Sequence, residues 1–209
     1  MKVGDTMLLQ SVRARAVVLG QGPLQLLIIK KIDKIIKISD CIVAFLKAQN
    51  VQDVFVVPGD ANVHLLDSIG RDEELRFICT QMEKGAVMAA EAYAKMKSDL
   101  GVVVVSSGAS AANTISGVAN AWVDSTPMLV ISGQARTEEY SDQVRQLGNK
   151  SLNIIALVKS ITKYAVKVTE SAEIKYHLEK AACLAKSGRP GPVWVDIPID
   201  IQGMTIDEN

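Results

Sequence analysis

The sequence is poor in the residues that build metal centres and disulfide frameworks. It has three cysteines and two histidines among 209 residues. Cys41, Cys79 and Cys183 are odd in number, far apart and set in apolar segments, which favours a reduced compartment and a cytoplasmic location. His64 and His177 are equally isolated, so no metal site is expected from these residues.

The chain also lacks net charge, long apolar runs and phosphate-binding motifs. Lysine plus arginine equals aspartate plus glutamate at 23 each, so no overall field attracts nucleic acid. No apolar run reaches the roughly 20 residues that span a bilayer. Neither Gly-x-Gly-x-x-Gly after the first strand nor Gly-x-x-x-x-Gly-Lys-Ser/Thr is present. We therefore expect no nucleic-acid partner, no membrane span and no nucleotide-phosphate site.

Residues 1–37 differ in character from the rest of the chain. Their short apolar runs are interrupted by a Gly-Gln-Gly-Pro breaker and end in a basic stretch, Lys30 to Lys37. We interpret them as a mobile or peripheral N-terminal extension. A membrane-surface helix around residues 24–37 is an open alternative, because basic amphipathic stretches bind membranes. The predicted domain spans residues 38–202, and residues 203–209 are a tail or the start of a linker.

From Ile38 onward, short apolar strands alternate with helices. The expected strands are Val54–Val57, Leu75–Ile78, Val102–Val105, Met128–Ile131, Tyr164–Val168 and Val193–Ile197. All-apolar strands separated by helices predict an α/β fold with an open, mostly parallel sheet and helices on both faces. Leu75–Ile78 is expected to be buried, and the apolar content of 48% can fill a substantial core.

Four polar or glycine-containing loops follow four of these strands. They are residues 58–60, 80–83, 106–110 and 132–134. Ligands of open parallel sheets bind beyond the carboxyl ends of the strands, so we expect the functional site at these loops. Simple turn chemistry is an alternative explanation for Gly59, Gly108 and Gly133.

Glu83 stands near the start of an alanine-rich helix expected over Gln81–Met96. The segment Thr80-x-x-Glu83 also has the pattern of a capping box, with Thr80 as the N-cap residue. In such a box the Glu83 carboxylate accepts a hydrogen bond from the Thr80 amide and needs no chemical role. Spacing alone leaves both the capping role and a chemical role open.

The order of motifs resembles that of the thiamine-diphosphate enzymes of the acetolactate synthase type. The matching motifs are Val57-Pro58-Gly59, Met82 to Ala86, Ala89 to Ala94, Gly101 to Gly108, Asn113, Asp124 to Met128, Ile131 to Gln134 and Gly188 to Pro198. They extend from Ile38 to about Gln202. The resemblance implies the N-terminal, pyrimidine-binding domain of such an enzyme.

This resemblance implies roles for particular residues. Glu83 matches the glutamate that hydrogen-bonds the pyrimidine ring of thiamine diphosphate. A carboxylate there favours the imino tautomer of the 4′-amino group, which removes the thiazolium C2 proton. The implied catalytic residue is Glu83, and the implied cofactor-binding residues are Pro58, Gly59, Glu83, Gly108, Ala109 and Asn113. Gln134 is expected to shape the pocket.

Several positions depart from the family pattern beside the implied cofactor. Met82 stands where a histidine is usual, and Ala109-Ser110 stand where Pro-Gly is usual. A family glutamine aligns with either Gln146 or Lys150, depending on where an insertion is placed. These departures make reduced or altered chemistry plausible.

The resemblance implies only half of an active site in this sequence. The Gly-Asp-Gly…Asn motif, which holds Mg²⁺ and the diphosphate in the family, has no match here. The other half is expected from a further domain in a homodimer or tetramer, or from a separate diphosphate-binding subunit. The implied substrate is pyruvate or another 2-keto acid, in carboligation or decarboxylation by a transferase or lyase. The alternative is a non-catalytic homologue or truncated scaffold that keeps the fold and an oligomer interface.

We predict that residues 1–37 add little to the stability of the domain, because the family resemblance begins at Ile38. A chain without them should melt within a few degrees of the full-length chain in scanning calorimetry. A larger fall in the melting temperature would mean that these residues pack against the domain.

Overall fold

The computed structural model describes residues 35–139, 141, 143–148 and 150–207. One compact unit spans Lys37–Ile206, and the expectations for residues 1–34 and 208–209 lie outside the described residues. Six strands of this unit form one sheet in the order β3-β2-β4-β5-β7-β6, and all neighbouring strands are parallel. The predicted α/β fold with an open parallel sheet is confirmed.

Each strand of this sheet lies within a few residues of its predicted position. The strands are β2 (Asp53–Val56), β3 (Arg76–Cys79), β4 (Gly101–Val105), β5 (Met128–Gln134), β6 (Tyr164–Lys167) and β7 (Pro192–Pro198). Two further short strands, β1 (Ile35–Lys37) and β8 (Thr205–Asp207), are not part of this sheet.

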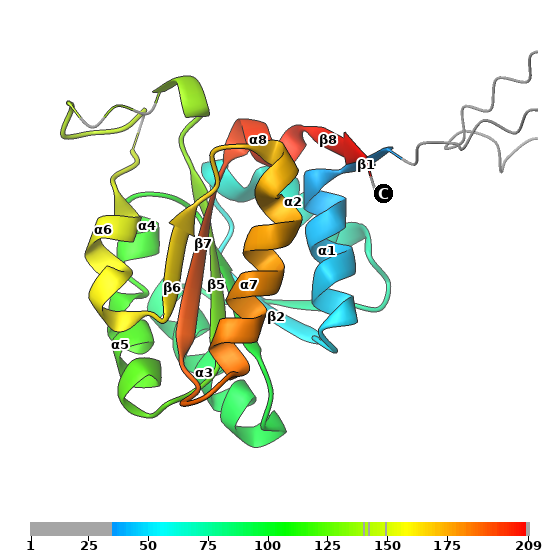
Figure 1. Ribbon diagram of the computed structural model, residues 1–209, viewed down its shortest axis with the longest axis vertical. Coiled ribbons are helices and arrows are strands. Elements are labelled where there is room, and N and C mark those ends of the chain that lie inside the picture. The colour runs from blue at the N-terminus through cyan, green and yellow to red at the C-terminus, as the bar shows by residue number, and fades with distance from the viewer. Residues whose placement is uncertain (1–34, 140, 142, 149, 208–209) are drawn as a thin grey trace, which may run out of the picture. The chain divides into compact units, whose positions relative to one another are not determined.

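Helices cover both faces of the sheet. They are α1 (Ile38–Ala48), α2 (Val63–Arg71), α3 (Glu83–Lys97), α4 (Ala109–Ala112), α5 (Ile115–Val123), α6 (Ile154–Val158), α7 (Ile174–Lys186) and α8 (Ile199–Gly203), with 3₁₀ turns at Asp60–Asn62, Thr137–Glu139, Lys159–Ile161 and Ser171–Glu173. One hydrophobic cluster joins α1, α2, α7 and α8 to the sheet, and a second joins α3, α5 and α6 to it. Figure 1 shows α1 and α7 in front of the sheet and α3 and α5 behind it.

Each central strand supplies both clusters, because successive side chains of a strand point to opposite faces. In β4, Val102 and Val104 belong to the cluster under α1, and Val103 and Val105 belong to the cluster under α3. All four valines are fully buried. This two-sided burial accounts for the continuous apolar strands in the sequence.

The prediction that the strand near residues 75–78 is buried is wrong. β3 exposes all four of its residues, and only Leu75, which precedes it, is buried. β3 is the outermost strand at one side of the sheet and pairs only with β2. This edge position leaves Phe77 48% and Ile78 40% exposed.

A polar cluster is buried where β5 and β7 end. Asp196 is 1% exposed, and its carboxylate accepts hydrogen bonds from the Ser132 hydroxyl at 2.5 Å and the Gln134 side-chain amide at 2.8 Å. The Trp194 indole N–H donates to the Ser132 hydroxyl oxygen at 2.8 Å. Complete burial raises the pKa of Asp196 to about 7, although the hydrogen bonds from Ser132 and Gln134 act in the opposite direction.

We predict that Asp196 makes the stability of the domain depend on pH. Its pKa rises from 3.8 to about 7 on folding, so the folded state binds more protons than the unfolded state between these values. The free energy of unfolding should fall through this range as pH rises, by up to about 1.4 kcal/mol per pH unit, and level off above it. Asp196→Asn should flatten this slope in urea denaturation series. The exposed control Asp67→Asn should keep it, and an equal slope in both variants would contradict the assignment.

Candidate functional site

Four loops lie side by side at the carboxyl edge of the sheet. They follow β3, β2, β4 and β5, which are neighbours in this order. All four strands are parallel, so their carboxyl ends point to the same edge. The topology therefore brings together the loops expected at residues 80–83, 58–60 and 106–110. The fourth loop was expected at residues 132–134, but these residues are the end of β5, because the ladder with β7 continues through them, and the loop begins at residue 135.

Glu83 is the first residue of α3, and the capping box predicted for it does not form. The N-cap residue is Met82, whose backbone is extended with φ −151° and ψ 151°. The Thr80 amide bonds to the Val56 carbonyl oxygen at 3.0 Å, and the Thr80 hydroxyl donates to the Met82 carbonyl oxygen at 3.0 Å. The prediction of Thr80 as N-cap is wrong because the sheet ladder extends to Thr80 and delays the helix start. The Glu83 carboxylate is thus left for other partners.

A break between two helices brings Asn113 to Glu83. The small-residue stretch over residues 109–123 forms two helices, α4 and α5, with Asn113 between them. Its side-chain amide donates to the Glu83 carboxylate at 3.1 Å. Two of the residues implied as cofactor ligands, from loops after different strands, are therefore in direct contact.

The surroundings of Glu83 keep its carboxyl group ionised. Partial burial acts to raise the pKa of Glu83, but hydrogen bonding with Ser110, its own backbone amide and Asn113 outweighs burial and lowers the pKa. The Asn113 side-chain amide makes its hydrogen bond at 3.1 Å, whereas the buried Ser110 hydroxyl has no hydrogen-bond partner in this conformation. The amino end of α3 also favours a negative charge. A charged acceptor thus stands at the loop edge, half exposed.

The glycines of these loops allow the loops to pack against each other. A Cβ atom on Gly59 would collide with the Ser106 side chain, and one on Gly133 would collide with the Ala61 carbonyl oxygen. Gly108 has φ +64°, and a Cβ there would overlap the Lys150 carbonyl oxygen. Turn chemistry alone explains only part of these positions, because close approach of neighbouring loops is the stronger constraint.

Two polar residues that the sequence reasoning missed hold the loop after β2. The Asn62 side chain accepts from the Gly59 amide at 2.9 Å and donates to the Val57 carbonyl oxygen at 3.0 Å. The Ser106 hydroxyl accepts from the Ala61 amide at 3.2 Å. An asparagine three residues after a loop glycine was the available sequence signal, since such side chains bond to nearby backbone groups.

A small cleft of about 140 Å³ opens between the loops after β2, β4 and β5. Its lining residues are Asp60, Ala61, Ser107, Gln134, Ala135, Arg136, Glu139, Lys150, Ser151 and Ile199. Gln134 is held by the Asp196 carboxylate and the Leu152 carbonyl oxygen, which fits its expected role in shaping a pocket. Lys150 lines the cleft, whereas Gln146, the other candidate for the family glutamine, does not. Glu83 lies outside the lining.

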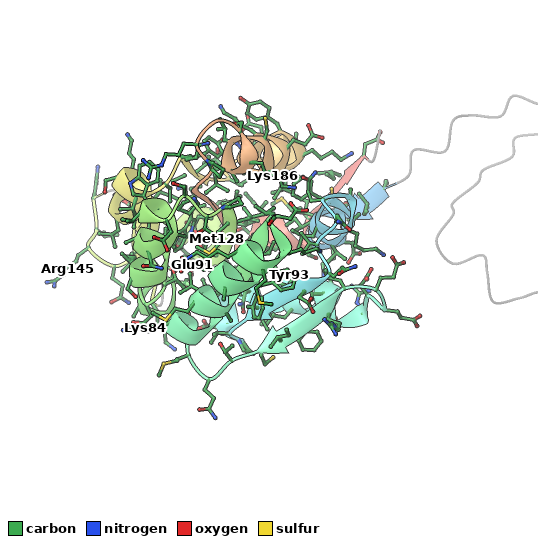
Figure 2. The ribbon with its side chains drawn as sticks, turned by 90° about the horizontal axis from the view of Figure 1, so that it is seen from below. Lys84, Glu91, Tyr93, Met128, Arg145 and Lys186 are labelled. Carbon is green, nitrogen blue, oxygen red and sulfur yellow. The ribbon has the colours of Figure 1, made fainter. Side chains whose placement is uncertain are left out.

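Contacts along α3 fix the position of Glu83. Glu91 is buried, and its carboxylate accepts two hydrogen bonds of 2.8 Å from the Asn120 side chain of α5. The Tyr93 ring packs edge-on against Phe55 of β2, with 5.8 Å between the ring centres. Figure 2 shows Glu91 and Tyr93 on different sides of α3. The helix is therefore held from α5 and from the sheet.

Among the residues that the structure describes, no group of three or more His, Cys, Asp or Glu side chains is placed to hold a metal ion. Within the same part of the chain, no helix has the length and apolar character needed to cross a membrane.

Comparison with known proteins relates this geometry to a family. Residues 36–157 match the family described as thiamine pyrophosphate enzyme, N-terminal TPP binding domain. The chain is 35% identical to the acetolactate synthase large subunit of Lactococcus lactis over 178 residues, which are 85% of this chain and 30% of that protein. It is 36% identical to the chloroplastic acetolactate synthase of Arabidopsis thaliana over 167 residues, which are 78% of this chain and 24% of that protein.

A mitochondrial relative agrees with these two. The acetolactate synthase catalytic subunit of Saccharomyces cerevisiae is 36% identical over 153 residues, which are 73% of this chain and 22% of that protein. The chain thus spans between about a fifth and a third of the length of these relatives. The match of more than half of the chain, together with the parallel sheet and its loop edge, shows that the chain belongs to the thiamine pyrophosphate enzymes and carries their N-terminal, pyrimidine-binding domain.

Proposed function

We propose that this domain supplies the pyrimidine-binding half of an active site that acts on pyruvate or another 2-keto acid. The observation that carries the proposal is the ionised Glu83 carboxylate at the amino end of α3. It accepts a hydrogen bond from Asn113 and does not take part in a capping box with Thr80. An ionised acceptor in this place fits a protonated ring nitrogen of the cofactor. Thiamine diphosphate, when bound, supplies the nucleophilic carbon that attacks the keto group and takes up the electrons released on decarboxylation.

The chain's own residues have separate tasks in this proposal. Glu83 accepts a hydrogen bond from the pyrimidine ring, and Asn113 orients its carboxylate. Pro58 and Ala109 are exposed at the same loop edge and offer apolar contact to the ring. Gly59 and Gly108 have no side chain and let the loops close around the ring. Mg²⁺ and the diphosphate would be held by another domain, because this sequence has no Gly-Asp-Gly…Asn motif.

The exposed apolar side chains around Glu83 are consistent with contact to a partner domain. Apolar side chains are exposed at the end of β3 and along the first half of α3, and they are Ile78, Met82 and Met88, each at least 40% exposed. Exposed apolar patches of this kind mark interaction sites. We infer that a diphosphate-binding domain, in a homodimer or tetramer or as a separate subunit, covers this surface and completes the site.

The proposal also covers the reaction class, the domain bounds and the location of the protein. Acetolactate synthase-like carboligation accords with the names of the relatives, and decarboxylation by a lyase is the other reaction that the family resemblance implies. We assign residues 1–37 to an extension, 38–202 to the pyrimidine-binding domain and 203–209 to a tail. A cytoplasmic location accords with the three free cysteines.

A non-catalytic homologue is the less favoured reading of the same chain. Met82, Ala109 and Ser110 depart from the family pattern, and Met82 is 59% exposed. However, the Glu83 carboxylate stays ionised and accepts a hydrogen bond from Asn113, which fits a working site better than a decayed one. An apolar Met82 keeps water away from the ring but cannot carry a proton, so it is expected to alter the chemistry rather than abolish it.

We predict that Glu83→Gln separates cofactor binding from cofactor activation. Thiamine diphosphate and Mg²⁺ should bind in calorimetric titration only when the chain is mixed with a diphosphate-binding domain from a close relative. In that mixture, proton exchange at the thiazolium C2, followed by NMR, should slow by about 10²-fold or more in Glu83→Gln, because a charged acceptor becomes a neutral amide.

The exposed substitution Glu73→Gln is the matched control and should leave both measurements unchanged. Equal exchange rates in Glu83→Gln and the control would remove Glu83 from the proposed role. Absence of cofactor binding in a properly assembled mixture would favour the non-catalytic homologue instead.

A further inference from the structure

A cavity of the described structure lies far from Glu83. It has a volume of about 530 Å³ and is lined by Trp122, Val123, Lys163, Ser187, Gly188, Arg189 and Pro190. These residues come from the segments that precede β5, β6 and β7, at the amino edge of the parallel sheet. β5 and β7 have seven residues each, so this cavity and the loop edge are roughly 20 Å apart. A ligand in the cavity would not touch a cofactor at Glu83.

One wall of the cavity is apolar and incompletely covered. Trp122 is 39% exposed and Val123 is 68% exposed, which is unusual for large side chains next to a buried core. Pro190 and the backbone of Gly188 extend the same wall. The volume falls within the range of about 300–1,000 Å³ that is typical of small-molecule sites.

Two cations stand beside this wall, held in place by neutral groups. The Arg189 guanidinium donates to the Ser125 hydroxyl at 2.6 Å and to the Val123 carbonyl oxygen at 3.2 Å. The Lys163 ammonium donates to the Ser187 carbonyl oxygen at 2.5 Å. Each cation therefore keeps further N–H donors that these bonds do not use.

No carboxylate among the described residues lies within ion-pair distance of either cation. The nearest acid in sequence to the apolar wall, Asp124, is paired with Lys95 at 2.6 Å. Lys186 of the neighbouring helix is paired with Asp99 at 2.7 Å. The positive charge of Lys163 and Arg189 is thus left for a partner from outside the described chain.

We propose that this cavity binds a small organic anion with an apolar body, such as an aromatic carboxylate or sulfonate. The body packs on Trp122 and Val123, and the anionic group accepts hydrogen bonds from Lys163 and Arg189. The pre-positioned cations lower the ordering cost of binding, because their side chains are already held by Ser125, Val123 and Ser187. The site is separate from the proposed pyrimidine site, and its occupant is a ligand other than the cofactor.

Two dyes that differ only in the anionic group test the proposal on the full chain. 8-Anilinonaphthalene-1-sulfonate carries a sulfonate, and N-phenyl-1-naphthylamine has the same rings without it. Lys163→Gln should weaken binding of the sulfonate by about fivefold or more and leave binding of the neutral dye unchanged, since only the charge-assisted contact is lost. Trp122→Ala should weaken both dyes, because it removes the apolar wall. Fluorescence titration measures all four affinities.

Arg145 provides the matched control, because it is exposed and extends away from the domain in Figure 2. Arg145→Gln should change neither affinity. Arg189→Lys keeps the positive charge beside Ser125 and should retain most of the sulfonate binding. Unchanged sulfonate binding in Lys163→Gln, or equal weakening of both dyes in it, would overturn the proposal.

Discussion

Burial of one parallel sheet on both faces is the constraint on which the rest of the structure depends. The central strands send alternate side chains into two hydrophobic clusters, so they have almost no room for polar groups along their length. Groups that must meet water or a ligand are therefore displaced to the loops at the strand ends. In a parallel sheet all carboxyl ends lie at one edge, and this gathers Glu83, Asn113 and the loop glycines into one region.

Asp196 is a polar residue that is nevertheless buried within a central strand, and its hydrogen bonds support the loop edge. It lies on the sheet face that Trp194 shares with α3 and α5, two residues before the end of β7. Its carboxyl group joins Ser132 and Gln134 of β5, and Gln134 in turn reaches the Leu152 carbonyl oxygen. A buried polar network of this kind is stable only when its members are bonded, so it fixes the ends of β5 and β7 relative to each other.

The position of Glu83 depends on contacts made further along α3. α3 is anchored by the Glu91–Asn120 hydrogen bonds and by packing of Tyr93 on Phe55, several residues after Glu83. Because these contacts position the helix, the carboxylate at its first residue is not needed for capping. It stays partly exposed and charged, with a hydrogen bond from the Asn113 side chain, at the edge where a partner domain is proposed to dock.

The sequence by itself determined the six strands, their parallel arrangement and the residues of the loop edge, because apolar strands buried on both faces leave a strong local pattern. It also carried the family resemblance through motifs such as Val57-Pro58-Gly59. Only the tertiary structure excludes the capping box that local spacing left open for Glu83. The Thr80 amide bonds to a neighbouring strand, and the Asn113 side chain bonds to a residue 30 positions earlier, so neither contact is visible in local spacing. The exposure of β3 depends likewise on its place at the sheet edge, and the Lys163–Arg189 cavity on segments far apart in the chain.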